Sequence, residues 1–184
     1  MYKICQNEQA SRRQREMEQG LLKLMLKRRF EDISVSDLCK FLQIPRKSFY
    51  RYFSSKDGAL YALLDHTMMD FQFSERHGLS GSAPGELDRY FAFWYEHKDL
   101  LDALTKSSLS GILVERATQF ALKERMMPRY MLSWNADFQG IAMSFAICGL
   151  MSMVIQWHQQ NYVQTPEEMT KIATSMLTRP LLPI

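Results

Sequence analysis

The residues best suited to binding chemistry lie in one short stretch, residues 45–53, which reads PRKSFYRYF. Three of its nine residues are basic and four are aromatic. On a helix that turns by roughly 100° per residue, one arc of about 140° holds Arg46, Lys47, Tyr50 and Arg51. The remaining side chains fill a separate arc that is apolar enough to pack. The charged arc is either a solvated surface or a surface that contacts phosphate.

The preceding residues favour contact with phosphate. Ser34 and Asp37 form a capping-box pattern, which predicts that a short helix begins there and runs over residues 35–42. A three-residue turn at 43–45 leads into the basic helix, and a longer amphipathic helix is expected earlier, over residues 11–27. This order of elements is the helix-turn-helix plan, in which the last helix enters the major groove of DNA.

The rest of the chain lacks the patterns typical of catalysis or metal binding. We find no nucleophile with its base, no paired catalytic carboxylates and no glycine-rich phosphate loop. The four histidines lack metal-ligand spacing. The three cysteines are far apart and odd in number, and we expect Cys39 and Cys148 to be small core residues rather than redox sensors. The sequence therefore predicts neither an enzyme nor a bound cofactor.

Composition predicts an all-α protein with two domains. Apolar residues make up 46% of 184, enough for a sizeable core. Residues 1–60 carry 13 Lys and Arg against 7 Asp and Glu, whereas residues 61–184 carry 10 against 13. A basic first part on a mildly acidic body suggests that only the first part meets a polyanion. We therefore predict a DNA-binding domain over residues 1–60, with its motif at 34–53, and a second domain over 61–184.

Helical patterns also fill the second domain. A serine-capped helix is expected to begin at residues 54–58, and the expected linker is the segment 78–85. The later helices are expected over 86–107 (one or two helices), within 108–127, over 136–161 and over 166–177. No apolar run reaches the roughly 18 residues of a membrane span, and the polar N-terminus lacks a signal-peptide centre. We expect a cytoplasmic protein with no membrane partner.

Residues 30–64 resemble the TetR family of bacterial one-component regulators. The resemblance is carried by a connected pattern across the second, third and fourth helices. Its members are Ser34, Asp37, Leu38, Cys39, Ser48, Tyr50, Phe53 and Lys56. Arg29 and Gln43 stand where the family often has glycine, which raises a question about the local backbone at both positions. The resemblance implies a three-helix DNA-binding domain followed by a helical effector-binding and dimerisation domain.

The interpretation as a DNA-binding domain predicts which side chains contact DNA. Lys56 begins the following helix and is expected to reach the phosphate backbone, as is the helix N-terminus itself. Tyr52 falls on the packed arc, although its hydroxyl could extend to a phosphate. The expected contact residues are Ser36, Arg46, Lys47, Ser48, Tyr50, Arg51, Tyr52 and Lys56. Arg12, Arg13 and Arg15 have two interpretations, as an arm that reaches DNA or as a frayed charged end.

The second domain resembles a TetR subgroup that includes regulators of dihydroxyacetone kinase operons, through residues 90–104 and 148–169. The resemblance implies that the last two helices pair with their copies in a homodimer, and we expect Met151, Ile155 and Met169 at that interface. Aromatic and methionine residues crowd this domain, either as core or as the walls of a pocket. The expected pocket residues are Phe91, Trp94, Tyr95, Phe120 and Phe138.

These expectations describe a sequence-specific transcriptional repressor that binds double-stranded operator DNA as a homodimer. A small apolar or aromatic effector would release it by shifting the spacing of its two recognition helices. Two alternatives stay open. One is a DNA-binding regulator controlled by a protein partner, without a small ligand. The other is a helical protein that binds small molecules and not DNA.

Overall fold

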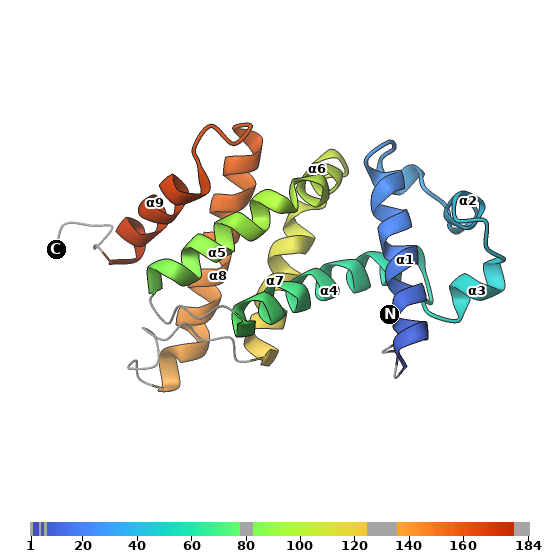
Figure 1. Ribbon diagram of the computed structural model, residues 1–184, viewed down its shortest axis with the longest axis horizontal. Coiled ribbons are helices and arrows are strands. Elements are labelled where there is room, and N and C mark those ends of the chain that lie inside the picture. Colours follow the sequence, from blue (N-terminus) through green and yellow to red (C-terminus); the bar gives the residue numbers. More distant parts are fainter. Residues whose placement is uncertain (1, 4, 6, 78–82, 125–135, 179–184) are drawn as a thin grey trace. The chain divides into compact units, whose positions relative to one another are not determined.

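The computed structural model describes residues 2–3, 5, 7–77, 83–124 and 136–178. The chain divides into two compact units (Figure 1). The first comprises residues 1–67 and 99–116, and the second comprises residues 68–98 and 117–184. All the regular elements in the described residues are helices, which confirms the expected all-α class. The compact units do not follow the boundary expected at residue 60, and the functional division at that boundary stays a prediction.

The first unit contains the expected helix-turn-helix. Figure 1 shows its first three helices, α1 (Glu8–Met25), α2 (Val35–Phe41) and α3 (Arg46–Tyr50), with a 3-10 turn at Phe30–Asp32 between the first two. Helices α4 (Lys56–His77) and α7 (Ser110–Glu124) begin in this unit. Most of α6 (Lys98–Lys106) also lies in it.

Side-chain caps fix the starts of these helices. The Ser34 hydroxyl accepts the backbone N–H of Asp37 at 3.0 Å, and the Asp37 carboxylate accepts the N–H of Ser34 at 2.9 Å. The predicted capping box is therefore confirmed, and it satisfies two N–H groups that the helix leaves unpaired. Ser55 caps α4 in the expected way, because its hydroxyl accepts the N–H of Gly58 at 3.1 Å.

The packing of α1 on α2 depends on a glycine. A Cβ atom added at Gly20 would lie 2.5 Å from one Leu42 methyl and 3.0 Å from its Cγ. The missing side chain therefore lets Leu42 approach the α1 backbone closely. Beside this contact, Leu21, Met25, Leu38 and Phe49 are buried and form the apolar centre of the helix-turn-helix.

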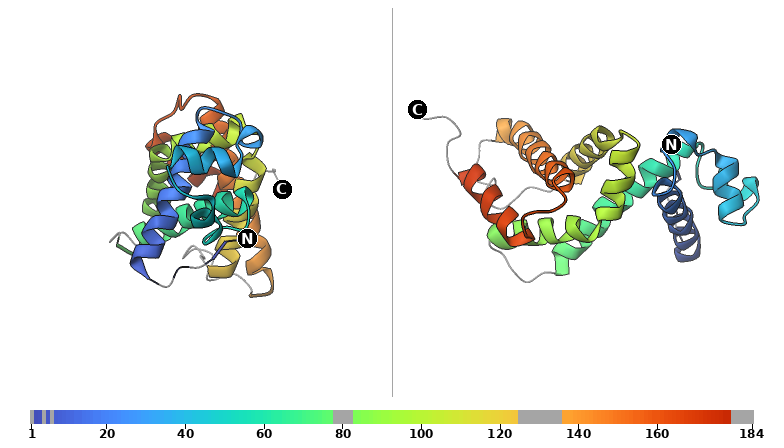
Figure 2. Two further views of the ribbon diagram at one scale, coloured as in Figure 1. Left: turned by 90° about the vertical axis from the view of Figure 1, so that its right-hand side faces the viewer. Right: turned by 90° about the horizontal axis from the view of Figure 1, so that it is seen from above.

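The second unit is built from α5 (Ala83–Glu96), α8 (Ala136–Gln159) and α9 (Pro166–Thr178) with the adjoining parts of α4 and α7. Helix α5 packs along α9, as Figures 1 and 2 both show. Thr165 and Glu168 form a second reciprocal cap at the start of α9, with N–H to oxygen distances of 2.8 and 3.2 Å. This cap confirms the predicted start of the last helix.

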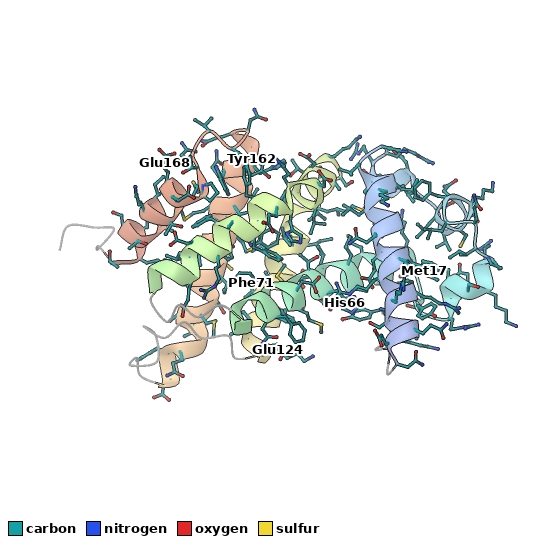
Figure 3. The ribbon with its side chains drawn as sticks, viewed as in Figure 1. Met17, His66, Phe71, Glu124, Tyr162 and Glu168 are labelled. Carbon is teal, nitrogen blue, oxygen red and sulfur yellow. The ribbon has the colours of Figure 1, made fainter. Side chains whose placement is uncertain are left out.

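Aromatic rings fill the core of the second unit. Trp157 of α8 packs against Phe91 and Tyr95 of α5, with ring centroids 5.9 and 5.7 Å apart. Phe71, labelled in Figure 3, lies edge-on to Tyr90 at 5.7 Å. These contacts tie α5 to α4 on one side and to α8 on the other.

The helix boundaries differ from the sequence predictions at a few points. The region 86–107 forms two helices, α5 and α6, and α5 begins at Ala83, so it includes part of the expected linker. The other linker residues, 78–82, lie outside the described residues. Helix α3 is shorter than expected, because Pro45 is its N-cap rather than its first helical residue and the helix ends at Tyr50.

Helix α8 is unusually apolar over most of its length. Its segment Asp137–Gln159 has a hydropathy of 1.8 in its most apolar 18-residue window, and only 28% of that window is buried. By length and composition this segment resembles a membrane span, but core helices of soluble proteins can have the same length and composition. Ile141 and Phe145 are exposed in the described part of the chain, whereas Met143, Met151 and Val154 are buried.

Candidate nucleic-acid interface

Helix α3 presents the cationic face that the sequence predicts. Arg46, Lys47 and Arg51 are exposed, and Tyr50 between them retains 45% of its accessible surface. On the opposite side, Phe49 is fully buried and packs against Phe53, which follows the helix, with ring centroids 5.2 Å apart. The helix is therefore anchored by its aromatic face while its charges remain accessible.

Arg46 and Tyr50 are held together one turn apart. The Arg46 guanidinium donates a hydrogen bond to the Tyr50 hydroxyl at 3.2 Å and lies 5.8 Å from the centre of its ring. This hydrogen bond raises the pKa of the Arg46 guanidinium above its usual value. The pair presents a fixed cation together with a hydroxyl, two groups that can contact phosphate or a base edge.

The turn between α2 and α3 sets the direction in which α3 leaves α2. Gln43 adopts a φ of 55°, in the left-handed region, and the N–H of Ile44 donates to the Cys39 carbonyl at 3.0 Å. The turn therefore forms with glutamine at the position where the family often has glycine. Arg29 has a φ of −64°, which any residue adopts, so no glycine is needed there.

Three of the remaining predicted contact residues are partly or fully buried. Ser36 and Ser48 are half-buried, on α2 and α3. Tyr52 is buried, with 5% of its surface exposed, and its backbone carbonyl accepts the N–H of Lys3 at 2.9 Å. The ring of Tyr52 is thus part of the core, in agreement with its place on the packed arc, and a contact of its hydroxyl with phosphate stays a prediction.

The Lys56 side chain makes contacts within the fold that the sequence analysis did not predict. Its ammonium donates to the Phe30 carbonyl at 2.6 Å and to the Glu31 carbonyl at 3.3 Å, and it lies 4.3 Å from the Phe30 ring centre. It therefore fastens the turn after α1 to the start of α4. A contact with phosphate would have to use the donor capacity that these two carbonyls leave.

A polar network behind α3 was also missed by sequence reasoning. Tyr2 donates to the Asp65 carboxylate at 2.7 Å, and the Arg116 Nε donates to the same carboxylate at 2.9 Å. His66, labelled in Figure 3, lies 2.8 Å from the buried Glu18 carboxylate, and its ring meets Tyr2 edge-on at 5.9 Å. Because these residues are scattered from position 2 to position 116, no local sequence pattern joins them.

Burial and charge shift the pKa values in this network. Burial, helped by the hydrogen bond to Asp65, raises the pKa of the Tyr2 phenol. Burial also raises the pKa of the Glu18 carboxyl, against the opposing effect of its hydrogen bond with His66. The Tyr2 phenol therefore remains a neutral donor, and the network links the N-terminal segment, α1, α4 and α7 within the first unit.

The residues expected at a dimer interface differ in how deeply they are buried within the chain. Met151 is buried inside the chain, with 1% of its surface exposed, and its sulfur accepts a hydrogen bond from Tyr90 at 3.0 Å. Met169 is also buried, whereas Ile155 is half-buried. The buried side chains of Met151 and Met169 are not available to a partner, so the expectation for these two residues needs correction.

The structure does not gather the five expected pocket residues onto one wall. Phe91, Trp94 and Phe120 are buried, while Tyr95 and Phe138 are exposed. Phe91 and Tyr95 pack on Trp157, and Trp94 joins them through Tyr90 at 6.3 Å. The rings of Phe91 and Trp94 thus belong to the aromatic core, Tyr95 lies at its edge, and an effector pocket stays a prediction.

The chain thus combines a helix-turn-helix that exposes the cationic side of α3 with a helical body. Among solved structures, the chain is similar to the dihydroxyacetone kinase operon activator DhaS, at 14% identity and a TM-score of 0.60 over 89% of this chain and 93% of that one. It is also similar to the fatty acid degradation regulator FadR from Bacillus halodurans, at 13% identity and a TM-score of 0.64 over 97% and 98%. These likenesses confirm the predicted fold.

No protein-family model and no curated protein matches the sequence.

Proposed function

We propose that the chain is a sequence-specific DNA-binding transcriptional regulator that acts as a homodimer in the cytoplasm. The observation that carries this proposal is the exposed cationic face of α3, placed on the second helix of a helix-turn-helix. Lys47 and Arg51 on that face can reach phosphate and base edges, because nothing in the described residues covers them. The likeness in fold to two regulators supports the same function.

The dimer is proposed from apolar side chains that the chain leaves uncovered. Ile141 and Phe145 on α8 retain 71% and 68% of their surfaces, and Ile172 and Met176 on α9 are exposed as well. Apolar surface of this extent is unfavourable in a soluble monomer. A second copy related by a twofold axis would cover it with the same residues, through an isologous interface.

The regulatory direction and the effector are the finer parts of the proposal. We propose a repressor that a small apolar or aromatic compound releases from its operator. DhaS is named as an activator, so transcription from a reporter must decide between repression and activation. Since FadR is named for fatty acid degradation, acyl compounds belong among the first effectors to test by thermal shift and operator release.

The decisive experiment measures DNA binding by fluorescence anisotropy, on the region flanking the protein's own gene. Lys47→Ala and Arg51→Ala should each weaken binding without unfolding the protein, because both side chains are exposed and surface changes move stability by less than about 0.5 kcal/mol. If Lys47 contacts only phosphate, its removal should also make the dependence of affinity on salt shallower by about one unit.

A matched control is Lys123→Ala, which removes one exposed cation from α7 outside the helix-turn-helix. Its affinity and salt dependence should equal those of the unmodified protein. Equal affinity and equal salt dependence in all three variants would rule out α3 as the recognition helix. The protein would then be better described as a small-molecule-binding helical protein.

A further inference from the structure

A cleft of about 250 Å³ lies between α1 and α3, within the first unit. Buried apolar side chains, among them Met17 of α1, form its floor, and charged or polar side chains from both helices form its rim. Met17 is labelled in Figure 3 on α1. The lining residues are Arg13, Glu16, Met17, Leu42, Ile44, Ser48, Arg51 and Tyr52.

The rim of this cleft favours an anion. Arg13 of α1 and Arg51, the residue that follows α3, contribute two cationic side chains to its lining, and Ser48 contributes a side chain with a hydroxyl. The single carboxylate, Glu16, is already paired with Arg12 at 3.3 Å. Arg13 and Arg51 are both exposed, and within the described part of the chain neither forms an ion pair. Guanidinium groups bind phosphate oxygens through paired N–H donors.

The position of Arg51 connects the cleft to the proposed DNA surface. Arg51 belongs both to the rim and to the exposed cationic face of α3, beside Lys47 and Tyr50. A phosphate of a duplex that lies along this face would therefore pass the opening of the cleft. The same chemistry would suit a free inorganic phosphate, so the two sources must be separated by experiment.

We propose that this cleft binds a backbone phosphate of the operator, with Arg51 on one side and Arg13 of α1 on the other. The proposal rests on the proposed function and adds α1 to the DNA-contacting elements. It also distinguishes Arg13 from Arg12 and Arg15, to which the sequence analysis gave the same two interpretations. Arg12 forms an ion pair with Glu16, and Arg15 is half-buried near the Glu18 carboxylate. Of the three, only Arg13 lines the cleft.

The test compares Arg13→Gln with Lys23→Gln, which removes an exposed cation from the same helix but away from the cleft. Binding is measured by anisotropy on a mixed-sequence duplex over a range of salt concentrations, since a phosphate contact does not depend on sequence. Arg13→Gln should weaken binding by about tenfold at low salt and reduce the salt slope by about one unit. Lys23→Gln should leave the salt slope unchanged.

A third variant should act in the opposite direction. Glu16→Gln removes the only negative charge on the rim, so the duplex should bind more tightly than it binds the unmodified protein. Thermal unfolding of each variant serves as the check on folding, and we expect no change because Arg13, Glu16 and Lys23 are all exposed.

Two results would overturn the proposal while leaving the proposed function intact. The first is that Arg13→Gln binds the duplex normally while Lys47→Ala does not. The second is that inorganic phosphate alone, followed by calorimetry, binds the unmodified protein and not Arg13→Gln, with duplex affinity equal in both. If Lys47→Ala and Arg51→Ala also bind normally, the proposed function fails together with the cleft.

Discussion

Gln43 holds the turn between α2 and α3 in a backbone conformation that costs most residues free energy. Its φ of 55° lies in the left-handed region, where a side chain with a Cβ atom is disfavoured by roughly 1–2 kcal/mol. The turn nevertheless forms, because Leu38, Cys39 and Phe49 are buried on either side of it and the Ile44 N–H is satisfied by Cys39. Packing around the turn therefore outweighs the local cost.

Substitutions at Gln43 should separate backbone conformation from side-chain contacts. Gln43→Val should lower the free energy of unfolding by about 1–2 kcal/mol, because a β-branched residue is strained at positive φ. Gln43→Gly should be tolerated, since glycine reaches this region without strain. Urea unfolding of both variants measures the difference. Equal destabilisation by valine and glycine would show that the glutamine side chain, and not φ, determines stability here.

The sequence revealed the exposed cationic residues of the site but not the groups that hold them. Arg46, Lys47 and Arg51 follow from helical periodicity, which needs only neighbouring residues. The hydrogen bond from Lys56 to the Phe30 carbonyl does not follow from helical periodicity, because it joins residues that are 26 positions apart. The burial of Tyr52 agrees with its place on the packed arc, whereas the position of its hydroxyl depends on the chain beyond Tyr50, where α3 ends.

At the scale of elements, local sequence patterns predicted where several helices begin. They did not predict which residues from distant parts of the sequence come into contact. The caps at Ser34, Ser55 and Thr165 are all present, because a cap involves residues three or four apart. The network around Asp65 and His66 was missed, because it depends on how distant elements meet. The apolar character of α8 was recognised, yet the side that packs inside the chain could not be read from a helix that is apolar nearly all round.

The capping box of α2 should make stability depend on acid. Its hydrogen bonds from Ser34 lower the pKa of the Asp37 carboxyl below 3.8. The unfolded chain therefore takes up this proton at higher pH than the folded chain does, so the stabilisation is present above pH 3.8 and is lost as pH falls through the folded value. Urea unfolding of the protein and of Asp37→Asn should show a stability difference at neutral pH that shrinks as the pH falls below 3.8.

The control for this effect is Asp57→Asn, another exposed acidic residue in a first helical turn. It changes the charge near a helix start without touching the capping box of α2. A stability difference for Asp37→Asn that stays constant as the pH falls well below 3.8 would contradict the role assigned to the ionised carboxylate.

At the scale of the whole molecule, exposed apolar side chains on α8 and α9 are the basis of the proposed dimer. Phe145 and Ile172 are exposed, whereas Met151 lies inside the same chain. This contrast divides the apolar residues of the last two helices into those that fold the protomer and those proposed to join two protomers.

Glutamate substitutions should distinguish the two groups. Phe145→Glu and Ile172→Glu should give folded monomers, because a charge at a twofold interface faces its own copy without compensation. Met151→Glu should instead unfold or aggregate the protein, since it buries a charge in the core. Sedimentation measures the first outcome and circular dichroism the second. Sedimentation of the unmodified protein as a monomer at micromolar concentration would refute the dimer.

The hydrogen bonds that join residues 26–30 to residues 106–107 have a consequence for how this protein is made and engineered. The Phe30 N–H donates to the Ser107 hydroxyl at 2.9 Å, and the Lys106 ammonium donates to the Leu26 carbonyl at 3.0 Å. On the ribosome, the first compact unit cannot be completed until residue 116 has left the exit tunnel, long after α3 has emerged. A chimera that exchanges only residues 1–60 for those of another protein of this fold separates these donors from their acceptors. A graft that also carries residues 99–116 keeps them together.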